Sequence, residues 1–273
     1  MSSAPSPIDE LLQIMQRLRD PESGCPWDQQ QTFASLIPYT LEEAYEVAEA
    51  VENGCEDELA DELGDLLFQV VFYARIAEEQ GAFDFARVCR NISDKLIRRH
   101  PPVFADEQVA SVEEQSKAWE QHKAQERAAK SSTEKPRILD GVSHALPALT
   151  RALKLQKRAA RVGFDWPDVQ GVLAKLQEEI AEVEAELKEP VDVDAMQHEV
   201  GDLLFAVVNL ARHLGVDPET ALRMGNRRFE SRFAHVEEAL GGADGLAQAG
   251  LDEMESAWGE AKAREKASMQ DED

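Results

Sequence analysis

The feature that most constrains the fold of this chain is an internal repeat with an offset of about 137 residues. The segment Glu62–Phe68 (ELGDLLF) recurs as Glu199–Phe205 (EVGDLLF). The match extends to both sides with small changes of offset, pairing Gly24–Trp27 with Gly163–Trp166, Glu42–Glu46 with Glu178–Glu182, and Lys95 and Arg99 with Arg228 and Arg232. One unit has been duplicated, so the chain is predicted to form two domains of the same kind.

The two copies are separated by a polar stretch. Residues 125–141 contain a Ser-Ser-Thr patch, a Pro and a closing Gly, which is the composition of a linker. We therefore expect an N-terminal domain over residues 1–124 and a C-terminal domain over residues 142–262. Residues 263–273 form a charged tail with almost no apolar side chains, and we expect this tail to be frayed.

Apolar residues recur at intervals of three and four in both copies, which is the spacing of one helical face. Alternating strand patterns are rare, so we predict an all-α fold in which each half is a helical bundle. Thr40 is expected to cap a helix that starts at Leu41, with Glu43 completing a capping box. Asn53-Gly54 is expected to end that helix, and Glu189-Pro190 is expected to end its counterpart.

The net charge of −25 excludes some classes of partner. With 54 acidic against 29 basic residues, the chain is not expected to bind duplex nucleic acid, which needs clustered Lys and Arg. No apolar run is long enough to span a bilayer and no secretory signal is visible, so we expect a soluble, cytoplasmic protein without membrane contact. Residues 42–65 hold eleven acids and residues 178–202 hold ten, so most of the excess charge lies in two short stretches.

These two stretches carry the chemistry that we expect. Glu179 and Glu182 are three residues apart on one predicted helix, and Glu199 and Asp202 are three apart on the next. If the helices run antiparallel, the four carboxylates face each other and form an all-oxygen site that suits Mg²⁺. The N-terminal copy repeats the plan, which makes a candidate second metal site of Glu43, Glu46, Glu62 and Asp65. The plain alternative for both sets is a solvated acidic helix face.

The pattern Glu-Glu-x-x-Glu followed by Glu-x-x-Asp occurs twice, each time after Gly-x-x-Trp, and it resembles the MazG nucleoside triphosphate pyrophosphohydrolases in their two-domain bacterial form. The resemblance runs from about Leu11 to Trp258, and its most specific phrases are Gly24–Asp28, Pro38–Glu43, Arg98–Pro101 and Val162–Trp166. It implies two tandem MazG-like helical domains, a homodimer, and dependence on Mg²⁺, with Mn²⁺ as a second candidate. It also implies hydrolysis of NTPs and dNTPs between the α- and β-phosphates to NMP and pyrophosphate.

The resemblance further implies roles for single residues, with the C-terminal half as the catalytic one. Glu179, Glu182, Glu199 and Asp202 resemble the family's metal ligands. Lys175, Arg228 and Arg232 resemble its phosphate-contacting cations, and Trp258 resembles a tryptophan near the nucleotide that can stack on any base. Glu178 is either a support for the ligands or the base for the attacking water. The alternatives are ordinary surface pairing for the three cations and a core position for Trp258.

The N-terminal copy has no counterpart of Lys175, because Pro38-Tyr39 occupies that place, so we expect a structural or regulatory N-terminal half. Trp27 and Trp166 are expected to be packing residues.

Two other classes of protein remain as rival interpretations. A di-iron carboxylate bundle needs Glu-x-x-His pairs, and none of the six histidines has Glu three residues before it. A non-enzymatic helical adaptor linked to a toxin–antitoxin system is the other alternative.

Overall fold

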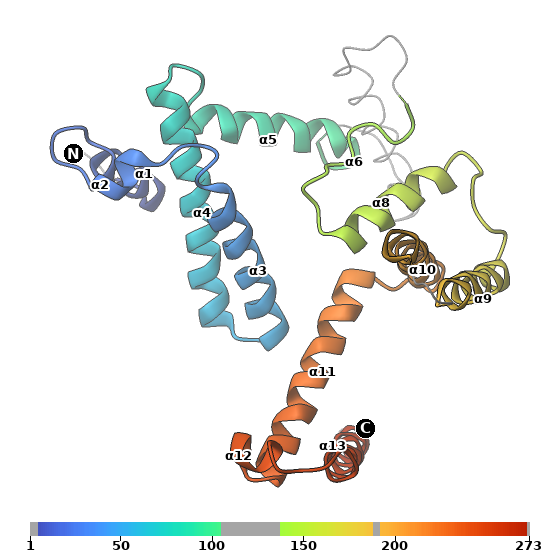
Figure 1. The fold of residues 1–273 in the computed structure, drawn as a ribbon. Helices are drawn as coiled ribbons and strands as arrows, with labels where there is room; N and C mark the ends of the chain where they lie inside the picture. The colour runs from blue at the N-terminus through green and yellow to red at the C-terminus, as the bar shows by residue number, and fades with distance from the viewer. Residues whose placement is uncertain (1–4, 105–136, 188–191, 272–273) are drawn as a thin grey trace. The chain divides into compact units, whose positions relative to one another are not determined.

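A computed structural model describes residues 5–104, 137–187 and 192–271, and every regular element in these ranges is a helix (Figure 1). The chain divides into two compact units, Met1–Glu126 and Arg127–Asp273. The predicted all-α class is therefore confirmed. Residues 125–136 of the predicted linker lie outside the described residues, so the domain boundaries given above stay predictions.

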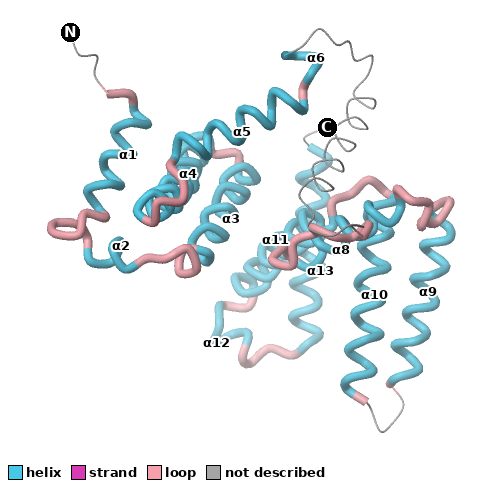
Figure 2. The backbone as a smooth tube through the Cα atoms, turned by 90° about the horizontal axis from the view of Figure 1, so that it is seen from above, coloured by secondary structure: helices cyan, strands magenta, loops and turns pink. Residues whose placement is uncertain are grey.

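The N-terminal unit is built on an antiparallel pair of long helices. Its helices are α1 (Pro7–Leu18), α2 (Pro26–Gln30), α3 (Ile37–Asn53), α4 (Glu56–Glu79), α5 (Phe85–Arg99) and α6 (Pro101–Phe104). Helices α3 and α4 run side by side in both views, and α1 and α5 contact α4 (Figure 1 and Figure 2). Buried apolar side chains from α1, the loop before α3, and α4 form the core; they are Met15, Leu36, Val71, Phe72 and Ile76.

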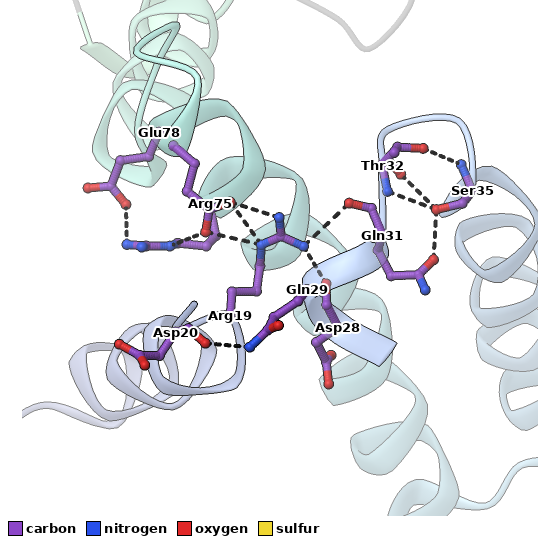
Figure 3. A network of polar contacts seen from close by, with 10 residues as sticks. Arg19, Asp20, Asp28, Gln29, Gln31, Thr32, Ser35, Arg75 and Glu78 are labelled. Atoms are coloured by element: carbon purple, nitrogen blue, oxygen red, sulfur yellow. Dashed lines mark hydrogen bonds and ion pairs between the residues drawn. The ribbon is translucent and has the colours of Figure 1, made fainter. Parts of the chain in front are cut away.

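Arg19, at the end of α1, fixes the α2 segment against α4. Its guanidinium donates to both carboxylate oxygens of Glu79, at 3.1 and 2.7 Å. It also donates to the backbone carbonyl of Asp28 (Figure 3). It also lies over the Phe72 ring, 5.5 Å from the centroid. Burial opposes ionisation of Glu79, but hydrogen bonds from Arg19 and Arg75 hold the pKa of this carboxyl below its usual value.

The C-terminal unit repeats the helix pair. Its helices are α8 (Ala148–Ala160), α9 (Val169–Glu186), α10 (Val193–His213), α11 (Pro218–Ala239), α12 (Gly242–Leu246) and α13 (Leu251–Asp271). Figure 2 shows α9 and α10 running side by side, and α8 contacts α10. Thr150 on α8 donates to Glu219 at the start of α11, with 3.3 Å between Oγ1 and Oε2. Helices α12 and α13 pack against α11. None of the helices in the described ranges is long and apolar enough to cross a membrane.

The start of α3 corrects one prediction. The helix begins at Ile37, with Leu36 in the capping position, because Pro38 fits the first turn of a helix, where its missing N–H is not needed. Thr40 therefore lies inside the helix and is not a cap. Its hydroxyl donates to the Leu36 carbonyl at 3.0 Å and lies 2.9 Å from the Tyr73 hydroxyl, so it joins α3 to α4.

The helix ends agree in part with the predictions. Gly54 ends α3 as predicted, with a φ of 71° that glycine adopts without strain. The predicted break at Glu189-Pro190 lies outside the described residues. Helix α13 continues through the described part of the predicted tail to Asp271, and Glu265 in this stretch pairs with Arg232 on α11. That the tail frays stays a prediction.

Candidate active site

The acidic residues of each copy meet between its two long helices. In the C-terminal unit, carboxylate oxygens of Glu179 on α9 and of Glu199 and Asp202 on α10 all lie within 4.8 Å of one another. Glu182, one turn after Glu179, lies outside this group of three. Burial and the neighbouring carboxylates of Glu179 and Glu199 raise the pKa of Glu182, so it lies beside the group. The structure thus brings together three of the four predicted ligands and places the fourth next to them.

Glu179 is the buried member of this acid group, with 4% of its surface exposed. Its Oε1 forms an ion pair with the Nζ of Lys175, 2.7 Å away. Its Oε2 is buried and has no hydrogen-bond partner among the described residues. A buried carboxylate oxygen without a partner destabilises a protein, and a divalent cation beside it removes that penalty. The donors are all oxygen atoms, which fits Mg²⁺ or Mn²⁺ and not a soft metal.

Lys175 joins Glu179 to its neighbour Glu178. The lysine Nζ lies 2.8 Å from Glu178 Oε1 and 2.7 Å from Glu179 Oε1. The hydrogen bond with Glu178, followed by that with Glu179, holds the pKa of Lys175 above its usual range, so the lysine stays charged. The Glu178 side chain is 58% exposed and is not part of the group of three. A fixed cation therefore stands at the edge of the acid group.

The N-terminal unit has a similar acid group with different surroundings. Oxygens of Glu43, Glu46 and Glu62 lie within 4.8 Å of one another, and Asp65 lies outside this group. Burial and then the charge of Asp65 raise the pKa of Glu43, and burial and then the charge of Glu46 raise the pKa of Glu62. Buried Gln69, which the sequence did not point to, donates to Glu43 Oε1 at 3.4 Å.

The place of Lys175 is taken in the N-terminal copy by Tyr39. The ring of Tyr39 packs edge-on against Trp27, with centroids 5.6 Å apart, and its side chain brings no positive charge to the acid group. This agrees with the expectation that the N-terminal half has no counterpart of Lys175. Whether that half is inactive stays a prediction.

The other predicted substrate contacts lie on α11 and α13. Arg232 pairs with Glu265 at 2.7 Å and lies 5.6 Å from the ring centroid of Trp258. Trp258 also contacts Phe229, with centroids 5.3 Å apart. Arg232 and Trp258 are therefore neighbours. Among the described residues, no hydrogen bond, ion pair or ring contact joins them or Arg228 to the acid group around Glu179.

The loop before α9 holds a charged residue that the sequence did not point to. Asp165 accepts from Arg212 Nη1 at 2.9 Å and lies 3.1 Å from His213 Nε2. The Arg212 hydrogen bonds outweigh burial and, together with His213, lower the pKa of Asp165 to about 2. Arg212 matches Arg75 in the repeat, but its acidic partner lies 47 residues away, so spacing gave no signal for the pair.

Comparison with known proteins places this chain in a family. The model of the MazG nucleotide pyrophosphohydrolase domain matches the chain twice, over residues 31–104 and 168–237. The nucleoside triphosphate pyrophosphohydrolase of Escherichia coli K12 is 53% identical over 261 residues, which cover 94% of this chain and 98% of that protein. The nucleoside triphosphate pyrophosphohydrolase/pyrophosphatase MazG of Thermotoga maritima is 44% identical over 93% of this chain and 95% of its own length. The chain therefore belongs to the MazG nucleotide pyrophosphohydrolase family.

Proposed function

We propose that this pyrophosphohydrolase splits nucleoside triphosphates between the α- and β-phosphates and releases NMP and pyrophosphate. The observation that carries the proposal is the buried Glu179 Oε2, which has no partner among the described residues and borders two further carboxylates. Such a group suits the cation that accompanies a nucleoside triphosphate. The names of the Escherichia coli and Thermotoga maritima relatives support this reaction class.

Glu179, Glu182, Glu199 and Asp202 would hold Mg²⁺, or Mn²⁺ in its place. When bound, the cation lowers the pKa of a coordinated water and neutralises phosphate charge. The chain's own part is to hold the four carboxylates in place before the substrate arrives, two on α9 and two on α10.

Lys175 and Glu178 are proposed to act on the substrate and the attacking water. Lys175 is charged and faces the acid group, so it can contact the phosphates and stabilise the charge that grows on the leaving pyrophosphate. Glu178 lies within hydrogen-bond reach of Lys175, and more than half of its side chain is exposed to solvent. We assign to Glu178 the removal of a proton from the attacking water.

Arg228, Arg232 and Trp258 are proposed to complete the site from a second copy of the chain. In one chain they lie on α11 and α13, without a polar or ring contact to the acid group among the described residues. The outer face of α10 is apolar and uncovered: Val200, Leu204 and Val207 are 40%, 52% and 45% exposed. A homodimer would cover these side chains, since large exposed apolar faces mark interaction sites.

The N-terminal acid group of Glu43, Glu46, Glu62 and Asp65 is proposed as a second metal site without catalysis, because Tyr39 stands where the C-terminal copy has Lys175. We also propose a broad range over NTPs and dNTPs, a cytoplasmic location, and no partnership with duplex nucleic acid or membranes. The family match favours the enzyme over the non-enzymatic adaptor.

Chromatography of the reaction products tests the proposed function. Purified full-length protein is incubated with each of the common NTPs and dNTPs, with Mg²⁺ in one series and EDTA in the other. The expected products are NMP and pyrophosphate in the Mg²⁺ series alone. Release of NDP and phosphate, or no product from any nucleotide, would overturn the proposal, and the second result would favour the adaptor.

A further inference from the structure

The two acid groups of the repeat have equivalent carboxylates but different charged neighbours. In the C-terminal group, the ammonium of Lys175 lies 2.7 Å from Glu179 Oε1 and offsets one negative charge. Residues 42–65 of the N-terminal copy contain no Lys or Arg. Within the described ranges, no ion pair joins a basic side chain to the four N-terminal acids, which are Glu43, Glu46, Glu62 and Asp65. The N-terminal group is therefore more negative by one charge at close range.

A neutral amide makes the contact that the lysine makes in the other copy. Gln69 lies on α4, seven residues after Glu62 and four after Asp65, so the helix places all three on one face. The Nε2 of Gln69 donates to Glu43 Oε1 at 3.4 Å. The amide thus contacts the acid group without adding a charge to it.

The same amide has an oxygen without a partner. Gln69 is 5% exposed, and its Oε1 is buried and has no hydrogen-bond partner among the described residues. Because Oε1 and Nε2 belong to one planar amide, this oxygen lies beside the acid group that Nε2 contacts. A buried carbonyl oxygen without a partner destabilises a protein. Carboxylate and amide oxygens together are ligands of hard divalent cations, and such a cation, or a water that it holds, would supply the missing partner.

Polar contacts next to this amide join α3 to α4. One turn further along α4, the hydroxyl of Tyr73 lies 2.9 Å from the hydroxyl of Thr40 on α3. The C-terminal copy has Leu210 and Leu176 at these places of the repeat, and Ala206 in place of the amide. The polar contacts thus belong to the N-terminal copy, where they connect the two helices beside the acid group before any ion is bound.

We infer that the N-terminal acid group binds a divalent cation by itself, without nucleotide and more tightly than the C-terminal group, and that Gln69 positions Glu43 and presents an oxygen to this cation. The inference rests on the proposed function, because it deepens the second metal site given there. In the C-terminal group the charge of Lys175 repels a bare cation. Absence of one positive charge a few ångström from a divalent ion strengthens its binding by about tenfold or more. The N-terminal cation therefore holds α3 to α4 whether or not a substrate is present.

Mn²⁺ binding to the full-length protein without nucleotide tests the inference. Paramagnetic resonance measures the free Mn²⁺ during a titration of two variants. Glu179→Gln leaves only the N-terminal group intact, and Glu43→Gln leaves only the C-terminal group intact. We expect Glu179→Gln to bind one Mn²⁺ about tenfold or more tightly than Glu43→Gln does. Equal affinities, tighter binding in Glu43→Gln, or no binding in Glu179→Gln would overturn the inference.

Reciprocal changes of charge test its cause. In the Glu179→Gln background, Tyr39→Lys installs the lysine of the C-terminal copy and should weaken Mn²⁺ binding about tenfold, whereas the neutral control Tyr39→Leu should leave it unchanged. In the Glu43→Gln background, Lys175→Met should strengthen Mn²⁺ binding about tenfold. An affinity that stays the same in either Tyr39→Lys or Lys175→Met, or that falls equally in Tyr39→Leu, would refute the role of charge.

Two substitutions of Gln69 in the Glu179→Gln background test the part of the amide. Gln69→Ala installs the residue of the C-terminal copy and should weaken Mn²⁺ binding about tenfold. Gln69→Glu keeps an oxygen at this place and should bind Mn²⁺ within about threefold of the unsubstituted background. Cooperative melting in EDTA shows that each variant is folded. Unchanged binding in Gln69→Ala, or equal losses in the two variants, would refute the part assigned to the Gln69 oxygen.

The hydrolysis assay separates a failure of this inference from a failure of the proposed function. NMP production by the wild-type protein, together with no Mn²⁺ binding in Glu179→Gln, refutes the inference and leaves the proposed function in place. Tight Mn²⁺ binding in Glu179→Gln, together with no NMP from the wild-type protein, supports the inference and refutes the reaction.

Discussion

Glu179→Gln is expected to abolish the response of the C-terminal unit to Mg²⁺ while leaving its metal-free stability nearly unchanged. At an effective dielectric constant of about 20, the ion pair with Lys175 at 2.7 Å contributes roughly −6 kcal/mol. Repulsion from Glu199 and Asp202, at up to 4.8 Å, contributes roughly +3.5 kcal/mol each. The opposing contributions nearly cancel and solvent screens both, so loss of the charge changes the metal-free stability by no more than about 1–2 kcal/mol.

The same substitution removes the carboxylate oxygen that we assign to the cation. At a Mg²⁺ concentration of about 100 Kd, a single site stabilises the native state by about 2.7 kcal/mol. For a unit of this size the melting temperature should then rise by about 5–10 °C. Scanning calorimetry with Mg²⁺ or EDTA measures the rise, in a Glu43→Gln background so that the N-terminal acid group does not contribute.

Glu178→Gln is the matched control for this experiment. Glu178 precedes Glu179 on the same helix and also pairs with Lys175, at 2.8 Å, but it lies outside the group of three acids. We expect Glu178→Gln to keep the Mg²⁺-induced rise and Glu179→Gln to lose it. Equal responses in the two variants would refute the reasoning, because the effect would then come from general negative charge on α9.

Three further predictions concern the scaffolds of the two units. Asp165→Asn should lower the free energy of unfolding by about 1–2 kcal/mol near pH 6. The pKa of Asp165 is lowered from 3.8 to about 2, so its contribution to stability is present above pH 4 and is lost as the pH falls toward 2. Denaturant titrations of both proteins from pH 6 to pH 3 should show this difference shrink, and a constant difference would contradict the assignment. Gly171→Ala gains about 1 kcal/mol of helix propensity, but its Cβ would lie 2.8 Å from the Trp166 ring, so calorimetry should show a net loss of about 1–2 kcal/mol. Phe72→Ala should destabilise the N-terminal unit by about 3–5 kcal/mol in urea titration, because its ring is fully buried; a loss below 1 kcal/mol would contradict the packing.

Local spacing predicted the parts of the fold that depend on helical periodicity. The pairs Glu179 and Glu182, and Glu199 and Asp202, are each three residues apart, and a helix places such residues on one face whatever the rest of the chain does. The internal repeat, which is also read directly from the sequence, predicted the two units. Thr40 shows the limit of local signals, since a proline two residues earlier already starts the helix and the hydroxyl is used to reach Tyr73.

The C-terminal unit has a cavity of about 640 Å³ between α8, α10 and the loop before α9. This cavity could not be predicted because it depends on side-chain volume at places far apart in the sequence. Asn209 reads as an ordinary polar residue until the fold places it opposite Gln156, 53 residues earlier on α8. Asp165 likewise gains its partner Arg212 only through the tertiary structure. Trp166 was expected to be a packing residue like Trp27; it packs on Gly171 with one side, but it also lines a cavity that Phe72 closes in the other copy.

Pyrophosphate release by two matched variants tests most directly the claim that the C-terminal acid group is the catalytic centre. Glu179→Gln and Glu43→Gln make the same chemical change at equivalent places of the repeat, and both are measured with saturating Mg²⁺ and ATP. We expect the rate to fall by about a hundredfold or more in Glu179→Gln and by no more than about threefold in Glu43→Gln. Equal losses in the two variants, or a larger loss in Glu43→Gln, would contradict the account.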